Sequence, residues 1–152
     1  MVKTKIILQP QKTTLDNYFH TDTTDYKFSE NTTLNPSEAI ALGSIAEAYH
    51  PSAIVRIPEV LYPLRVKTPD FLVDNIEYEV KAPIASSGIL FLARKAETQL
   101  RSPTGFLVME LMNIRNVSLC TLLKRTYKYF MIRHIKNFII MNHGDILYST
   151  HV

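Results

Sequence analysis

Residues 69–81 read PDFLVDNIEYEVK, and this stretch decides the fold of the chain. Apolar side chains lie on both sides of the dipeptide Asp74-Asn75, and both of these residues tolerate positive φ. The pattern predicts a tight β-hairpin with strands at 70–73 and 76–81. Counting outward from a two-residue loop places Asp70 directly opposite Glu79.

The predicted hairpin brings together two carboxylates and an ammonium group. Lys81 shares a strand face with Glu79, because side chains alternate with period two. Directly opposed like charges destabilise a sheet, and a divalent cation between Asp70 and Glu79 would remove that repulsion. Mg²⁺ prefers such hard oxygen ligands, with Mn²⁺ as a second candidate. A lysine beside the ion can orient a water and stabilise developing negative charge, so the set favours phosphodiester hydrolysis.

A solvated charge cluster on a surface hairpin is the alternative interpretation of the same residues. The sequence around the acids favours a functional site, because Phe71–Val73 and the residues between the acidic positions of the second strand are apolar. The acids are therefore predicted to lie within a core-forming sheet.

The rest of the chain predicts one mixed α/β domain at 35–152. Asn35 or Ser37 can cap a helix at 36–49, and a nearly continuous apolar run at 106–111 is typical of a strand buried on both faces. Further elements are predicted at 53–57 (strand), 88–100 and 118–133 (helices), and 135–141 with 146–148 (hairpin). Residues 1–34 keep no period beyond a short strand at 5–8, which predicts a loosely structured arm or lead-in segment.

The spacing of Pro69-Asp70, eight residues and Glu79-Val80-Lys81 resembles the signature of the PD-(D/E)XK nuclease superfamily. This resemblance implies a restriction-endonuclease-like αβββαβ core, with a mixed sheet flanked by helices, here extended by a C-terminal helix and hairpin. From about residue 68 the chain also resembles the C-terminal nuclease domains of bacterial contact-dependent growth-inhibition and polymorphic toxins. In these, a similar hairpin precedes a helix ending in A-x-x-Q, here Ala96 to Gln99.

The toxin resemblance implies a bacterial Mg²⁺-dependent endonuclease that acts on tRNA or another RNA in the cytoplasm of the producing or target cell. It also implies a cognate immunity protein as inhibitor. Two other functions stay open on the sequence: a DNase of a mobile element or restriction system, and a non-catalytic nucleic-acid-binding module of the same fold.

Two accessory residues follow from helix geometry and the resemblance. Glu38 shares the inner face of the first predicted helix with its apolar stripe, so it is a candidate third metal ligand. The alternative is an acid that complements the dipole of the first helical turn. Gln99, at the edge of the buried face of the second helix, is a candidate for binding substrate or water, or an ordinary boundary residue.

Composition adds weaker constraints. The net charge of +3 is compatible with a polyanionic partner without requiring one. One face of the third helix carries Lys124, Arg125, Lys128 and Arg133, which predicts either a surface that tracks a phosphate backbone or a solvated helix face. The single cysteine, Cys120, is predicted to be buried. No apolar run reaches the ~20 residues that a membrane span needs.

Overall fold

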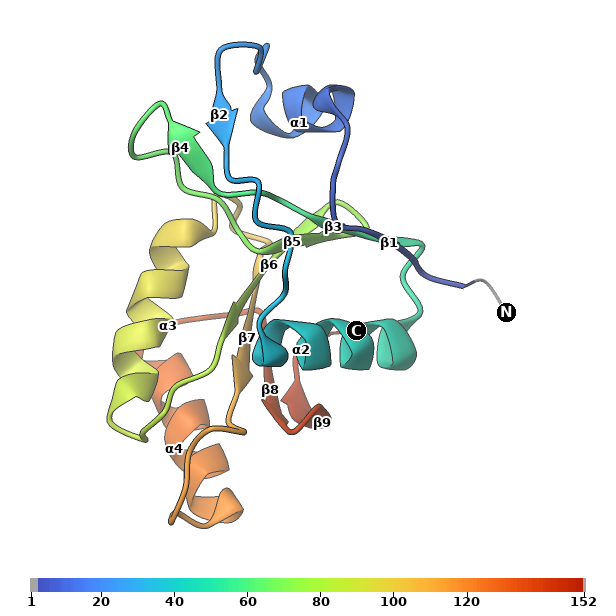
Figure 1. The fold of residues 1–152 in the computed structure, drawn as a ribbon. Coiled ribbons are helices and arrows are strands. Elements are labelled where there is room, and N and C mark those ends of the chain that lie inside the picture. The colour runs from blue at the N-terminus through green and yellow to red at the C-terminus, as the bar shows by residue number, and fades with distance from the viewer. Residues whose placement is uncertain (1–2, 152) are drawn as a thin grey trace.

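A seven-stranded mixed sheet forms the centre of the computed structural model, which describes residues 3–151 (Figure 1). Its strand order is β1-β3-β5-β6-β7-β8-β9, and a separate two-stranded sheet pairs β2 with β4. The strands are β1 (Lys5–Ile7), β2 (Lys27–Phe28), β3 (Ala53–Arg56), β4 (Val60–Tyr62), β5 (Phe71–Val73), β6 (Ile76–Lys81), β7 (Phe106–Glu110), β8 (Phe138–Asn142) and β9 (Asp145–Ser149). The helices are α1 (Lys12–Phe19), α2 (Pro36–Tyr49), α3 (Gly88–Gln99) and α4 (Leu119–Ile132).

The predicted order αβββαβ is present as α2, β3, β5, β6, α3 and β7, with β4 inserted between β3 and β5. Strands β5 and β6 are antiparallel, whereas β6, β7 and β8 run parallel to one another. The predicted C-terminal helix and hairpin follow as α4 and β8–β9. The expected mixed α/β class, with helices flanking one sheet, is confirmed.

Helices cover both faces of the sheet. α2 packs on one face, where Ala41, Leu42 and Ile45 meet the inward residues of β5 and β6, and α3 and α4 pack on the other (Figure 1). All five residues of β7 are buried between these layers, as its apolar sequence predicts. The centre of the sheet is therefore fixed from both sides by apolar packing.

The hairpin of β5 and β6 has the predicted two-residue turn. Asp74 and Asn75 both adopt positive φ, 47° and 67°, and Val73 pairs with Ile76. Asp74 also accepts hydrogen bonds from the backbone N–H groups of Ser52 and Ala53, at 3.1 and 3.0 Å. These contacts attach the turn to the start of β3 and hold the register of the hairpin.

Residues 3–34 contain more regular structure than the sequence pattern predicts, because β1, α1 and β2 lie in this segment. β1 adds a parallel edge strand to β3, close to the predicted strand at 5–8. α1 was not predicted, because its only buried side chains are Leu15 and Phe19, too few to show a helical period. These two residues form a third core with Ile57, Val60 and Leu72.

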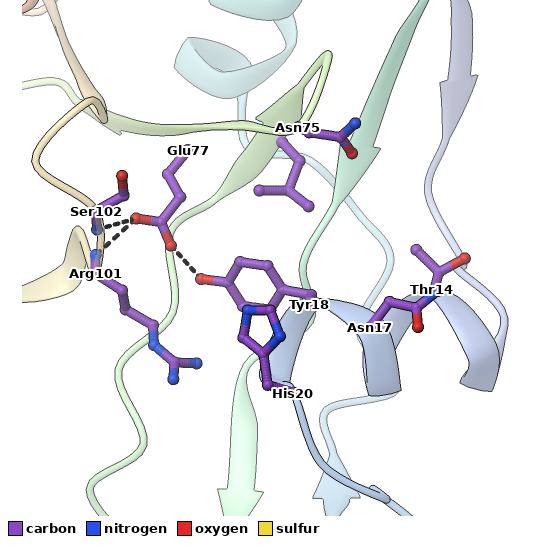
Figure 2. A pocket seen from close by; sticks show the side chains of 9 residues that line it. Thr14, Asn17, Tyr18, His20, Asn75, Glu77, Arg101 and Ser102 are labelled. Carbon is purple, nitrogen blue, oxygen red and sulfur yellow. Dashed lines mark hydrogen bonds between the residues drawn. The ribbon is translucent and has the colours of Figure 1, made fainter.

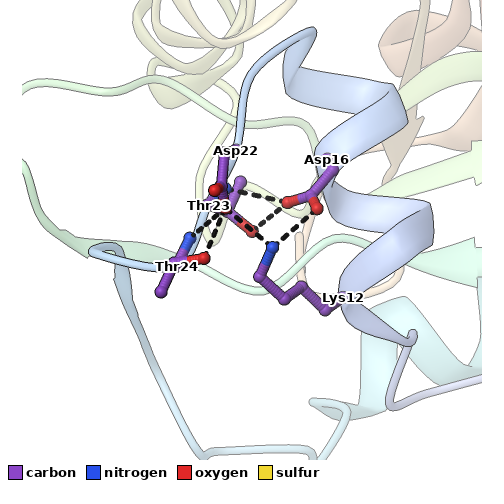
Figure 3. A network of polar contacts seen from close by, with 5 residues as sticks. All are labelled: Lys12, Asp16, Asp22, Thr23 and Thr24. Atoms are coloured by element: carbon purple, nitrogen blue, oxygen red, sulfur yellow. Dashed lines mark hydrogen bonds and ion pairs between the residues drawn. The ribbon is translucent and has the colours of Figure 1, made fainter.

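A polar network closes the loop that follows α1 (Figure 3). Lys12 Nζ lies 2.7 Å from a carboxylate oxygen of Asp16 and 2.7 Å from one of Asp22. Asp16 also accepts a hydrogen bond from the backbone N–H of Thr23, at 2.8 Å. These contacts hold the loop at residues 20–24 against α1, through side chains that are close in sequence.

Cys120 is exposed, so the prediction of a buried cysteine is wrong. The buried stripe of α4 consists of Leu122, Thr126 and Phe130, spaced by four residues. Cys120 lies two residues before this stripe, which turns it by about 200° to the opposite face of the helix. Among residues 3–151, no helix is long and apolar enough to cross a membrane.

Candidate active site

Asp70 and Glu79 face each other across the open end of the β5–β6 hairpin, as the sequence predicts. The backbone N–H of Asp70 donates to Glu79 Oε1 at 3.0 Å, and the N–H of Val80 donates to Asp70 Oδ2 at 2.8 Å. Each carboxylate thus uses one oxygen to accept a backbone hydrogen bond from the opposite strand. The two acidic side chains are held together by the ladder that forms the hairpin.

Lys81 lies two residues after Glu79 on β6, so the two side chains are on the same face of the strand. Its Nζ atom is 3.0 Å from Glu79 Oε2. The side chain of Glu79 is 1% exposed and that of Lys81 is 17% exposed, so water screens this ion pair only weakly. The structure brings Asp70, Glu79 and Lys81 into one group, and their chemical roles stay predictions.

The carboxyls of this group are hard to ionise. Burial, followed by the negative charge of Glu79, raises the pKa of Asp70 to about 7. Burial also raises the pKa of Glu79, although the ammonium group of Lys81 opposes that shift. One cation thus faces two acids, of which Glu79 is buried and Asp70 is partly buried, so a further positive charge would be bound favourably here.

Glu38 lies in the first turn of α2, as one of the two alternatives from the sequence has it, and its role as a metal ligand stays a prediction. It completes a capping box at the start of α2, where the N–H of Asn35 donates to Glu38 Oε1 at 3.0 Å. Burial raises the pKa of Glu38, the charge of Asp70 raises it further, and the charge of Arg56 lowers it. Glu38 therefore caps its helix and also lies within electrostatic reach of Asp70.

Gln99, the last residue of α3, lines the same cavity as Asp70. The cavity has a volume of about 520 Å³. Gln99 Oε1 is buried and has no hydrogen-bond partner among residues 3–151. A buried amide oxygen without a donor costs free energy, which favours the interpretation that Gln99 contacts a substrate or a water.

The predicted basic face of α4 lies outside this cavity. Arg133, just beyond the end of the helix, pairs with Glu97 at 2.6 Å, and Arg125 Nη1 donates to Ser86 Oγ at 3.0 Å. Lys124 and Lys128 are exposed. The structure therefore does not bring these four cations to the carboxylates, and their contact with nucleic acid stays a prediction.

Sequence reasoning missed Arg56, at the end of β3. This arginine lines the cavity with Asp70 and Gln99, and its Nη1 atom is buried without a hydrogen-bond partner in the described part of the chain. A signal was present in the sequence, because Arg56 is the one charged residue of the strand AIVR. Charged side chains in buried strands are rarely without a partner or a function.

Glu77 also has a role that the sequence did not reveal. Figure 2 shows its carboxylate between the hydroxyl of Tyr18 and the backbone that follows α3. It accepts from the N–H groups of Arg101 and Ser102, each at 2.7 Å. Glu77 thus fixes α1 to the sheet beside a second cavity of about 570 Å³.

The donor set fits a divalent cation such as Mg²⁺. Among residues 3–151, no group of three or more His, Cys, Asp or Glu side chains is arranged to hold an ion. Mg²⁺ needs fewer protein ligands, because it keeps several waters and commonly binds through one or two carboxylates together with substrate phosphates. Asp70 and Glu79 supply such a pair. The pKa of each is raised, chiefly by burial, so a bound cation would stabilise their ionised forms.

No family model matches the chain. No curated protein matches it either. Among solved structures it is similar to a chain of the CdiA-CT/CdiI toxin and immunity complex from Burkholderia pseudomallei, at 17% sequence identity and a TM-score of 0.47. The match covers 79% of this chain and 94% of that one.

Proposed function

We propose that this chain is a metal-dependent endonuclease that hydrolyses phosphodiester bonds. The observation that carries the proposal is the pair of opposed carboxylates, Asp70 and Glu79, with Lys81 Nζ 3.0 Å from Glu79. Such an arrangement destabilises a protein that binds no cation there, since Glu79 is buried, Asp70 is partly buried and the two carboxylates repel each other. A catalytic site that binds a cation beside a fixed ammonium group would explain why this unfavourable electrostatic arrangement is present.

Asp70 and Glu79 are the proposed ligands of Mg²⁺ or Mn²⁺, and Glu38 is a further candidate ligand. A bound divalent ion supplies a Lewis acid for the phosphate and lowers the pKa of a bound water. Lys81 lies on the same face and can donate a hydrogen bond to the attacking water or to a phosphate oxygen. Gln99 offers an unused amide oxygen to orient a water or a substrate hydroxyl.

RNA, and tRNA in particular, is the proposed substrate, and a toxin is the proposed biological class. This part of the proposal is supported by the resemblance of residues 68–152 to the nuclease domains of contact-dependent growth-inhibition toxins. The same resemblance supports a bacterial origin, action in the cytoplasm of the producing or target cell, and a cognate immunity protein as partner. A chain with such an inhibitor should lose activity when the protein encoded beside it is added in equimolar amount.

The test is incubation of the purified protein with total tRNA, rRNA and plasmid DNA, in Mg²⁺ and in excess chelator. We expect cleavage of tRNA or rRNA in Mg²⁺ and none in chelator. Cleavage of the plasmid alone would move the proposal from RNase to DNase. Full activity in chelator would overturn the metal mechanism.

A matched pair of variants shows whether any cleavage belongs to this site. Asp70→Asn removes one proposed ligand at constant size and should abolish activity. Asp145→Asn makes the same chemical change at an exposed position of β9 and should leave activity unchanged. Equal loss in both variants, or in neither, would contradict the assignment of the site.

A further inference from the structure

The cavity beside Asp70 is lined by an excess of cations. Arg56 from β3 and Arg65 and Lys67 from the loop after β4 line it, against the acids Glu59 and Asp70. Its volume of about 520 Å³ lies in the range of ordinary ligand cavities. A cation bound by the acids would make this cavity more positive still, which suits an anionic ligand.

Arg56 is the most enclosed cation of this basic group, because it is partly buried whereas Arg65 and Lys67 are exposed. It pairs with Phe71 across β3 and β5, which places it next to Asp70, and the N–H of Ile57 donates to the carbonyl oxygen of Asp70 at 3.1 Å. Its Nη1 atom is buried without a hydrogen-bond partner among the described residues. A guanidinium group with an unused N–H donor is suited to a phosphate, whose oxygens accept charge-assisted hydrogen bonds from it.

The rim of the cavity is apolar and exposed. Leu61 and Leu64 line the cavity, and Tyr62 lies between them in sequence. The exposed fraction is 52% for Leu61, 79% for Leu64 and 57% for Tyr62. Tyr62 directly follows the lining residue Leu61 but is not itself part of the lining. An exposed aromatic ring close in sequence to a basic cavity suits a single-stranded nucleic acid, because a base can stack on the ring while the backbone follows the cations.

We propose that this cavity binds a backbone phosphate of a single-stranded nucleic acid segment, through Arg56, Arg65 and Lys67, with an adjacent base stacked on Tyr62. The inference deepens the proposed nuclease function, on which it rests for the identity of the ligand. A duplex is disfavoured, since its bases are already stacked and paired and cannot reach Tyr62. The cations position a phosphate next to Asp70, and the rim selects for an unpaired strand.

The experiment measures binding by fluorescence anisotropy in excess chelator, so that no cleavage is needed. The probe is a labelled mixed-sequence strand of about 12 nucleotides, within the range of single-strand site sizes, as RNA, as DNA and as a DNA duplex. We expect both single strands to bind more tightly than the duplex. A preference for the duplex would overturn the proposal.

The variants test each part of the surface. Arg56→Gln should weaken single-strand binding roughly 10-fold or more, the usual scale for a hydrogen bond to a charged group. Arg65→Gln with Lys67→Gln should lower the slope of log affinity against log salt by about 1.4, or about 0.7 for each phosphate contact. Tyr62→Ala should weaken binding about 10-fold, whereas Tyr62→Phe, which keeps the ring, should not.

The control is Lys3→Gln with Lys5→Gln, which removes the same charge from two exposed residues. Lys5 pairs with Ala53 at the opposite end of β3 from Arg56. The control should leave affinity and salt slope unchanged. An equal effect of the control would reduce the binding to net charge and overturn the proposal.

The outcome is separable from that of the nuclease proposal. Arg56-dependent binding without any cleavage would support this inference and contradict the enzyme. Cleavage with binding that is independent of Arg56 and Tyr62 would support the enzyme and overturn this inference, leaving the apolar rim as a surface for a protein partner. Because Arg65 and Lys67 are exposed, their variant remains informative even if Arg56→Gln unfolds the chain.

Discussion

The ionised carboxylate of Asp70 destabilises the fold electrostatically, which is unexpected for an aspartate with a purely structural role. Its carboxylate lies opposite that of Glu79. The ammonium group of Lys81 forms its ion pair with Glu79 and not with Asp70. The sequence predicts this juxtaposition, because a two-residue turn and the period of two fix which residues meet. It could not predict Arg56, whose approach depends on the pairing of β3 with β5 rather than on local spacing.

The first prediction concerns the pH dependence of stability in the metal-free protein. The pKa of Asp70 rises from 3.8 to about 7 on folding, so the folded state binds this proton more tightly than the unfolded state. The stabilisation is complete below pH 3.8 and is lost as the pH rises through about 7. Between these values the parent should lose stability relative to Asp70→Asn, which has no such proton.

Urea unfolding of parent and Asp70→Asn in chelator, at pH 5 and pH 8, measures this effect. The free energy of unfolding of Asp70→Asn should equal or exceed that of the parent at pH 8. The difference should move in favour of the parent at pH 5. A marked loss of stability in Asp70→Asn at pH 8 would mean that the carboxylate itself is needed for the fold.

The second prediction separates catalysis from binding through Lys81. Lys81→Ala should lower the rate at saturating substrate by roughly 10²–10³, the usual effect of one preorganised electrostatic contact, or by more if the lysine also activates water. Affinity should change far less, because one contact among many contributes little to the salt-dependent binding free energy. Lys136→Ala, at an exposed position, is the control. A normal rate in Lys81→Ala would remove the catalytic assignment.

At the scale of elements, the local hairpin was predictable and the attachment of α1 was not. The β5–β6 hairpin follows from adjacent residues, whereas α1 has two buried apolar side chains and is held by a contact across 59 residues, from Tyr18 to Glu77. Glu77 shares its strand face with Glu79, yet its partners come from α1 and from the segment after α3. The register of the hairpin already places Glu79, and not Glu77, opposite Asp70, but the partners of Glu77 are visible only in the tertiary structure.

The third prediction tests this attachment. Glu77→Ala removes the acceptor of two backbone N–H groups, and each buried donor left without a partner costs about 1–3 kcal/mol. Tyr18→Phe removes one donor and should cost about 1 kcal/mol. Urea unfolding should rank Glu77→Ala well below Tyr18→Phe, with Glu47→Ala, exposed on α2, close to the parent. Equal stabilities of all three would contradict a structural role for Glu77.

At the scale of the whole molecule, apolar packing on both faces of the sheet stabilises a fold that contains two mutually repelling carboxylates. α2 covers one face and α3 and α4 cover the other (Figure 1). The carboxylates of Asp70 and Glu79 lie at the open end of the β5–β6 hairpin. From α2 onward the element order, apart from β4, was predictable from hydrophobic periods and turn signals. The parallel pairing of β1 with β3 was not, because strands separated by a helix and a long loop carry no local signal of their partner.

The last prediction links the site to global stability. A ligand that binds only the folded state stabilises it by RT ln(1 + [L]/Kd), about 2.7 kcal/mol at a concentration 100 times Kd. At that concentration Mg²⁺ should therefore raise the Tm of the parent by about 5–11 °C, because 1 kcal/mol shifts the Tm of a domain of about 150 residues by about 2–4 °C. The increase should be larger at pH 8 than at pH 5, because Asp70 must lose its proton to bind the ion and its pKa is about 7. Asp70→Asn should lose most of this increase and Asp145→Asn should keep it. The same shift in both variants would place the ion elsewhere, and the opposed carboxylates would then need another explanation.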